Sequence, residues 1–324
     1  MIGLPAIAMT IFVIGSLLWL IMKLVMGRVF SSQETSTRNY AGRSVHYGLG
    51  FVWIIWAVLL FICNLLGSFL PDSSVWWKSF FSHFSLYFNS VNPFLRLATP
   101  LVIACFFFGW LDDRFGKRGD GGFKGHIKAL FHGKITTGMI KVLGIGFTAL
   151  AVSALSFIDY LDFYQESYAL AMVILGGLAI ALSANFINLV DLRPARASKV
   201  YCLLALVGFF GVLIKLWLYN QYQWWLLFGH LLIFIWLIIP ILVVWPYDAG
   251  EKAMLGDAGA NPAGALLGFY FTCTLGGVGL AVYVAIMLFL NLASEKVSYS
   301  ALIERTPFLK WLDMLGRPKP SQPE

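Results

Sequence analysis

The sequence predicts an all-α protein that crosses a membrane many times. Hydrophobic residues make up 59% of its 324 residues and charged residues only 12%, and the apolar residues fall in long blocks separated by short polar segments. Runs of about 17 to 25 apolar residues can span a bilayer as helices, which satisfy their own backbone hydrogen bonds in lipid. We therefore expect a polytopic helical membrane protein and not a soluble domain.

The apolar blocks give the order of the predicted spans. They cover roughly residues 2–26, 48–70, 94–111, 138–157, 166–187, 199–218 and 224–245, followed by a long block over 262–293. This last block is one helix, or two that turn at Gly276-Gly277-Val278-Gly279, so the total is about eight or nine. A basic C-terminal tail prefers the cytoplasm, which requires the turn and therefore favours nine spans. We divide the chain into a transmembrane domain, residues 1–293, and a cytoplasmic or interfacial tail, residues 294–324.

The basic residues predict the orientation of the chain. The first block lacks the basic start of a cleavable signal, so it is interpreted as an anchor whose N-terminus lies outside. Segments 27–47, 112–137, 188–199 and 246–261 then lie in the cytoplasm and hold most of the lysines and arginines. This agrees with the positive-inside rule. Topology also accounts for much of the net charge of +7, and no nucleic-acid partner is expected.

Acidic and amide side chains gather on the same basic side, which topology does not explain. The third apolar run ends in Asp112-Asp113, where one carboxylate can hold a divalent cation while the other takes a proton. An exposed helix end balanced by Arg114 is the alternative. Asn185 and Asn188 are spaced to share one helix face near the bilayer, where unpaired amides are costly.

Asp191, in the same loop as the asparagines, and two further loops add to this group. Asp191 follows the asparagines, and Asp257 lies just before a predicted helix start, where an N-cap role is the alternative. Arg43, in a loop ahead of two glycines, either contacts phosphate or only satisfies the topology. Carboxylates among cations suit a hard ion such as Mg²⁺ that bridges a diphosphate.

These motifs resemble those of the polyprenyl-phosphate N-acetylhexosamine-1-phosphate transferase superfamily, which includes phospho-N-acetylmuramoyl-pentapeptide transferase. The resemblance covers roughly residues 38–300 and rests on Asp112-Asp113, Asn185-x-x-Asn188-Leu189-x-Asp191 and Gly256-Asp257-x-Gly259. It implies a divergent, multi-pass enzyme of a bacterial-type cell membrane that serves envelope polymer synthesis. Such an enzyme transfers a sugar 1-phosphate from a nucleotide diphosphate sugar, of the UDP-N-acetylhexosamine type, to polyprenyl phosphate.

The resemblance also implies roles for individual residues. Asp112 would help to activate the acceptor phosphate, and Asp113, Asp191 and Asp257 would hold Mg²⁺, with Mn²⁺ as the alternative ion. Asp112, Asp113 and Asp257 are the expected catalytic residues. The motifs and the resemblance together give the expected substrate-binding residues, which are Lys128, Asn185, Asn188, Asp191, Arg193, Arg43 and Lys252. The expected partners are the nucleotide-sugar donor, the polyprenyl phosphate acceptor and membrane lipid, and a homodimer is left open.

The chain departs from the family pattern at two places. The pattern Asn-Leu-x-Asp-Gly-x-Asp-Gly reads Asn188-Leu189-Val190-Asp191-Leu192-Arg193-Pro194-Ala195 here, so the base or ribose must be recognised differently. Arg193 or Arg196 could compensate by binding phosphate. Near the C-terminus, residues 295–300 replace a family histidine cluster, which argues against a muramoyl-pentapeptide donor. Apolar residues of 308–315 predict an interfacial amphipathic helix in place of a final span.

The departures keep a second interpretation open. A non-catalytic relative that binds lipid-linked intermediates, or scaffolds an envelope complex, is the alternative to an enzyme. A transporter comes third, because its ionisable residues should lie near the middle of the membrane, whereas these gather at one face.

Overall fold

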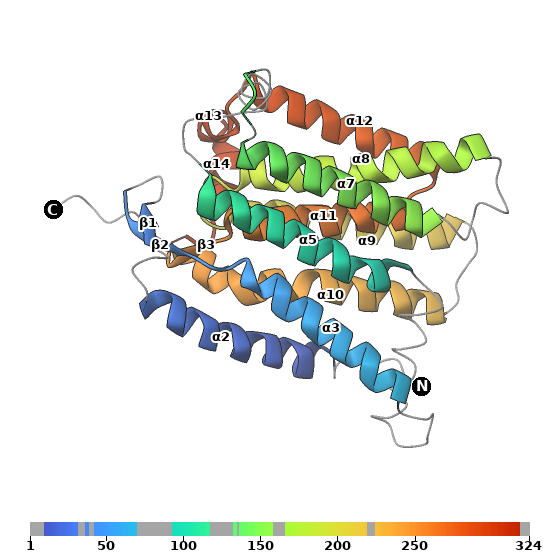
Figure 1. Ribbon diagram of the computed structural model, residues 1–324, viewed down its shortest axis with the longest axis horizontal. Helices are drawn as coiled ribbons and strands as arrows, with labels where there is room; N and C mark the ends of the chain where they lie inside the picture. The colour runs from blue at the N-terminus through green and yellow to red at the C-terminus, as the bar shows by residue number, and fades with distance from the viewer. Residues whose placement is uncertain are drawn as a thin grey trace.

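Long helices arranged side by side make up the protein (Figure 1). The computed structural model describes residues 10–31, 36–38, 42–69, 93–116, 132–134, 136–157, 166–218 and 224–317. Within them the long helices are α2 (Gly15–Ser31), α3 (Phe51–Phe69), α5 (Pro93–Phe115), α7 (Thr137–Phe157), α8 (Glu166–Val190), α9 (Arg196–Leu218), α10 (Trp224–Ala249), α11 (Gly256–Thr274) and α12 (Gly277–Ser294). A short π-helix, Thr10–Ile14, precedes α2. The predicted helical architecture is confirmed.

Six of the described helices are long and apolar enough to cross a membrane. They are Phe12–Phe30, Thr137–Phe157, Glu166–Val190, Arg196–Leu218, Gly229–Ala249 and Gly277–Ser294. Their outward faces carry large apolar side chains, with Phe147 77% exposed and Phe289 68% exposed. Apolar surface of this extent is typical of contact with lipid. A multi-pass membrane protein is therefore supported, while a total of about nine spans and the orientation stay predictions.

The last apolar block forms two helices. Helix α11 ends at Thr274 and α12 begins at Gly277, beside the predicted turn, and α12 then packs on α8. The two-helix interpretation of residues 262–293 is thus confirmed for the fold.

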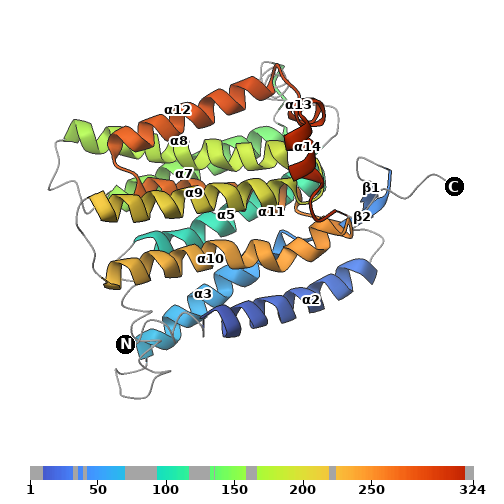
Figure 2. The same ribbon diagram turned by 180° about the vertical axis from the view of Figure 1, so that it is seen from behind.

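Helix α11 forms the centre of the bundle, where it packs on α5 and α8 and also contacts α3, α7 and α9 (Figures 1 and 2). Small residues permit this position. A Cβ built on Gly264 or Gly268 would lie 2.6–2.7 Å from the Cα atoms of Ala184 and Ile180 on α8, far inside van der Waals contact. A tryptophan of α3 holds α11 in this position, since the Trp53 indole N–H donates to the Gly259 carbonyl at 2.9 Å.

A three-stranded sheet, which the sequence analysis did not predict, lies at one end of the bundle. Strand β1 (Ser36–Arg38) pairs antiparallel with β2 (Ser44–Tyr47), and β2 pairs parallel with β3 (Ala253–Met254). Arg43, which the sequence placed in a loop, lies outside the strands and directly precedes β2. Because β3 leads directly into α11, the sheet joins the N-terminal part of the chain to the start of the central helix.

Two short helices are the last elements of the described residues, at the same end of the bundle (Figures 1 and 2). They are α13 (Tyr299–Arg305) and α14 (Pro307–Met314). We call residues 299–317 the C-terminal strap.

Candidate functional site at the start of helix α11

Carboxylates from other parts of the chain cap the N-terminus of α11. The Gly256 N–H donates to Asp191 Oδ2 at 3.0 Å, and the Asp257 and Ala258 N–H groups donate to the two oxygens of Asp113 at 3.1 and 2.8 Å. The first N–H groups of a helix have no partner within it, and the helix dipole favours negative charge there. The N-cap alternative for Asp257 is wrong, since Leu255 holds that position and Asp257 lies in the first turn.

A lysine connects the other two carboxylates. Lys141 Nζ lies 2.6 Å from Asp112 Oδ2 and also forms an ion pair with Asp257. The Thr137 hydroxyl donates to the second oxygen of Asp112 at 2.6 Å. Lys141 and Thr137 both lie near the start of α7, and the Lys141 side chain is only 14% exposed. One ammonium group therefore partly compensates two carboxylates that would otherwise repel each other.

Close backbone contact sets this geometry. A Cβ built on Gly109 of α5 would lie 2.6 Å from the Asp257 carbonyl carbon, and one on Gly50 would lie 2.7 Å from the Ala258 carbonyl. Both distances are far shorter than the 3.5–4.0 Å of ordinary carbon contacts. Because Gly109 has no side chain, α5 can bring Asp113 directly over the first N–H groups of α11, and Gly50 lets the start of α3 approach the same turn.

Electrostatic strain remains at Asp191. Burial raises the pKa of its carboxyl well above the usual value, and the negative charge of Asp248 raises it further, while the Gly256 N–H opposes both effects. Asp248 is itself buried and accepts a hydrogen bond from the Ser198 hydroxyl at 2.9 Å. A cation near Asp191 would relieve this repulsion.

The donor chemistry of these carboxylates suits a hard divalent cation. Among the residues that the structure describes, however, no group of three or more His, Cys, Asp or Glu side chains is arranged to hold a metal ion. The oxygens of Asp113 and Asp191 accept from N–H groups, and those of Asp112 and Asp257 contact Lys141. A cation bound here would share or replace some of these contacts.

The structure brings some of the other predicted site residues to this end of the bundle. Asn188 lies one turn before Asp191, whose N–H donates to the Asn188 carbonyl at 3.1 Å. Arg43 Nη1 lies 2.9 Å from Glu251 Oε2, and the Lys252 carbonyl accepts from the His46 N–H at 3.2 Å beside the sheet.

One further predicted residue, Asn185, is not part of this arrangement. Asn185 donates to Asn291 Oδ1 of α12 at 2.6 Å, on an exposed surface between α8 and α12. Lys128 lies outside the described residues.

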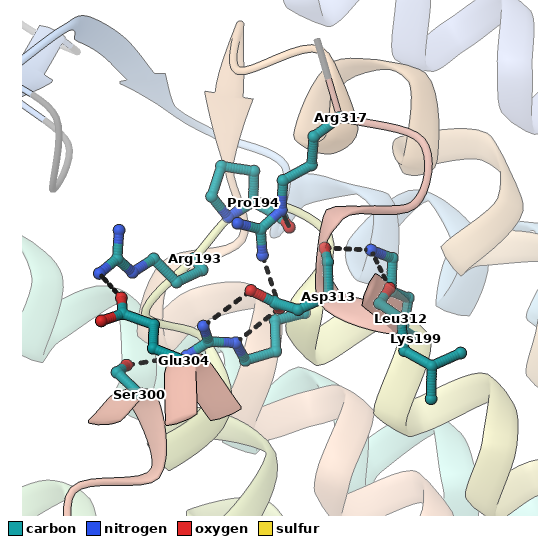
Figure 3. A network of polar contacts seen from close by, with 9 residues as sticks. Arg193, Pro194, Lys199, Ser300, Glu304, Leu312, Asp313 and Arg317 are labelled. Atoms are coloured by element: carbon teal, nitrogen blue, oxygen red, sulfur yellow. Dashed lines mark hydrogen bonds and ion pairs between the residues drawn. The ribbon is translucent and has the colours of Figure 1, made fainter. Parts of the chain in front are cut away.

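The turn that departs from the family pattern is held by the C-terminal strap (Figure 3). Arg193 Nη2 lies 2.8 Å from Glu304 Oε1, and Arg317 Nε donates to the Pro194 carbonyl at 2.9 Å. Arg196 donates from Nε and Nη2 to the two oxygens of Asp313 at 2.9 and 3.0 Å. Both arginines that were expected to contact phosphate thus contact acidic residues of the strap.

Sequence reasoning missed Lys141, Thr137 and Asp248. A signal for Lys141 was present, because it is an ionisable residue inside the predicted span 138–157, and such residues are usually functional. Thr137 and Asp248 carry no comparable signal, since their importance comes from contacts across the fold.

Comparison with other proteins adds no identification. The chain matches no model of a known protein family, and no curated protein sequence matches it. The function must therefore be argued from the site itself and from its motifs.

Proposed function

We propose that the protein is an integral-membrane phosphotransferase that moves a sugar 1-phosphate from a nucleotide diphosphate sugar to polyprenyl phosphate. The observation that carries the proposal is the convergence of Asp112, Asp113, Asp191 and Asp257 with Lys141 around the start of one helix. The residues come from four separate segments of the chain, and gathering partly buried like charges is costly, so such a cluster is a candidate functional site.

The proposed reaction is a phosphoryl transfer at the membrane surface. An oxygen of the acceptor phosphate attacks the sugar-bearing phosphorus of the donor, and the bond from that phosphorus to the bridging oxygen breaks. The nucleoside monophosphate leaves with the bridging oxygen, and a polyprenyl-diphosphate sugar forms. Catalysis of this kind depends on alignment and on compensation of phosphate charge.

The residues of the site would divide this work. Lys141 and the N-terminus of α11 would attract the diphosphate, as helix N-termini commonly do for phosphates. Asp112, held by Thr137 and Lys141, would orient the acceptor phosphate. Asp113, Asp191 and Asp257 would hold Mg²⁺, which would supply positive charge against the diphosphate.

The test is release of nucleoside monophosphate by the purified protein. The wild-type chain is incubated with polyprenyl phosphate, Mg²⁺ and a panel of UDP-N-acetylhexosamines, and the lipid product is identified by mass spectrometry. Asp112→Asn, Asp113→Asn and Asp257→Asn should each abolish turnover. Glu166→Gln removes an exposed carboxylate at the far end of α8 from Asp191 and serves as the matched control. Near-normal turnover in all three aspartate variants would refute the proposal.

A non-catalytic lipid-binding role is the second candidate. It is favoured by Pro194, which replaces a family aspartate, and by the engagement of Arg193 and Arg196 with the strap. Retained binding of polyprenyl phosphate, with no turnover of any nucleotide sugar, would favour this role.

A further inference from the structure

The C-terminal strap contains a helix whose two faces differ sharply in their surroundings. Asp313 of α14 faces the bundle and accepts from Arg196 and from Arg317, the latter at 2.7 Å. The Lys199 ammonium donates to the carbonyls of Leu312 and Asp313 at 3.0 and 2.6 Å, which satisfies the end of the helix. Polar contacts therefore fix the orientation of α14 on the start of α9.

The opposite face of α14 is apolar and exposed. Phe308, Trp311 and the C-cap residue Leu315 follow one another at intervals of three or four residues and so share this side of the helix; they are 64%, 58% and 44% exposed. The rings of Phe308 and Trp311 stack with their centroids 6.1 Å apart. In water such a face would be unfavourable, and Trp is enriched at membrane interfaces because its ring is apolar while its N–H is polar.

The position of α14 along the bundle identifies what covers this face. Helix α14 contacts α9 at Arg196 and Lys199, and the first strongly exposed apolar side chain of α9 is Leu203, at 61%. Four residues of helix correspond to about 6 Å along the axis. Interfacial helices bury their apolar face roughly 5–10 Å into the headgroup and acyl boundary, so α14 lies at the matching depth.

The charges around the strap favour an anionic surface. Arg305 and Lys310 are exposed, and neither forms an ion pair with any residue in the described part of the chain. Glu304 and Asp313, in contrast, contact arginines of the bundle. Among the described residues of the strap, the exposed charges that form no ion pair are therefore positive. Basic residues beside an apolar face are attracted to anionic lipid headgroups.

We propose that α14 lies in the anionic lipid surface of the membrane that the bundle spans, with Phe308, Trp311 and Leu315 inserted among the lipids. Through Asp313 and Arg317 the strap then connects the lipid surface to the turn 191–195, which carries Asp191. This proposal concerns the placement of the strap and does not depend on transferase activity.

Photocrosslinking of the full-length protein in lipid nanodiscs tests this placement. The photoreactive amino acid p-benzoylphenylalanine replaces Phe308 or Trp311, and in the matched control it replaces Lys310, on another face of the same helix. The variants are irradiated in phosphatidylglycerol and in phosphatidylcholine nanodiscs, and the adducts are identified by mass spectrometry. Elution profiles and hydrogen exchange of residues 299–317 establish that each variant is folded and that the strap is docked.

The outcomes are distinct. Several-fold more lipid adduct at positions 308 and 311 than at position 310, and more in phosphatidylglycerol than in phosphatidylcholine, supports the proposal. Crosslinks to a second copy of the chain at positions 308 and 311 overturn it in favour of a dimer interface. Equal, low lipid adduct at all three positions also overturns it, because the face would then lie in water.

Discussion

The close approach of α5 to α11 makes Gly109→Ala a sharp test of the site. The added methyl carbon would lie 2.6 Å from the Asp257 carbonyl carbon, so the two backbones must separate by about 1 Å to reach ordinary contact. The hydrogen bond from the Asp257 N–H to Asp113 Oδ1, now 3.1 Å, would then exceed the hydrogen-bonding range.

The cost can be worked from these contacts. Overpacking of this kind costs about 1–3 kcal/mol, and weakening a hydrogen bond to a charged group adds roughly 1.5–3 kcal/mol. Since α5 can tilt and retain part of the interaction, we expect Gly109→Ala to reduce the free energy of unfolding by about 2–4 kcal/mol. Turnover should fall about 100-fold, because a 1 Å misplacement commonly has that effect.

The assay compares Gly109→Ala with a matched glycine. A Cβ built on Gly146 of α7 meets nothing within 4 Å, so Gly146→Ala should leave stability unchanged or raise it by up to about 1 kcal/mol. Both variants are heated in detergent, and the folded fraction is measured by size-exclusion chromatography. Equal apparent melting temperatures in the two variants would refute the argument that Gly109 sets the distance between α5 and α11.

Three further predictions concern charge at the site and in the strap. Lys141→Met should lower turnover by about 100-fold, because Asp112 and Asp257 lose the ammonium group between them. Lys141→Arg keeps the positive charge and should retain part of the rate. Equal rates in the two variants would contradict the role of this charge. Chelation of Mg²⁺ should reversibly abolish release of nucleoside monophosphate. The elution profile should not change, because N–H groups and Lys141 hold the carboxylates when the ion is absent. Unchanged release would exclude a role for the ion. Burial alone would raise the pKa of Asp313, but the hydrogen bonds and charge of Arg196 lower it below the usual value. The stabilisation of the docked strap should therefore be complete above about pH 4, the usual pKa of an aspartate, and be lost as the pH falls below that value through the lowered pKa of Asp313. Asp313→Asn should undock the strap at neutral pH at a cost of roughly 3–5 kcal/mol. Hydrogen exchange of residues 299–317, corrected for intrinsic rates, should rise in both cases, and unchanged protection would contradict the assignment.

Patterns of apolar residues along the chain were sufficient to predict the helices. Each predicted apolar block contains a helix, and the glycines near residue 276 marked where the last block divides. This succeeds because backbone groups in lipid must bond within their own segment, so that apolar length alone predicts a helix. The same reasoning marked Asp112, Asp113, Asp191 and Asp257, because a carboxylate beside a bilayer needs a partner wherever the chain later places it.

The partners themselves depend on contacts between distant segments, which no local pattern encodes. Lys141 lies 29 residues from Asp112 in sequence and 116 from Asp257, and their contact requires α5, α7 and α11 to meet at one end. Arg193 and Arg196, which the sequence presented as free cations, contact acidic residues more than 100 positions away. The sheet around Arg43 likewise needs β3 to come from the far part of the chain.

The amino-acid sequence by itself determined the membrane setting, the helical segments and the acidic residues gathered on a single side, since each follows from the cost of placing a given side chain in lipid or water. Only the tertiary structure decided that these carboxylates surround the N-terminus of α11 with Lys141 among them, and that the strap holds the turn beside Asp191. The physical reason is that hydrogen bonds and ion pairs act over a few ångströms, so their partners are fixed by packing, and the glycines at the contacts of α11 allow that packing.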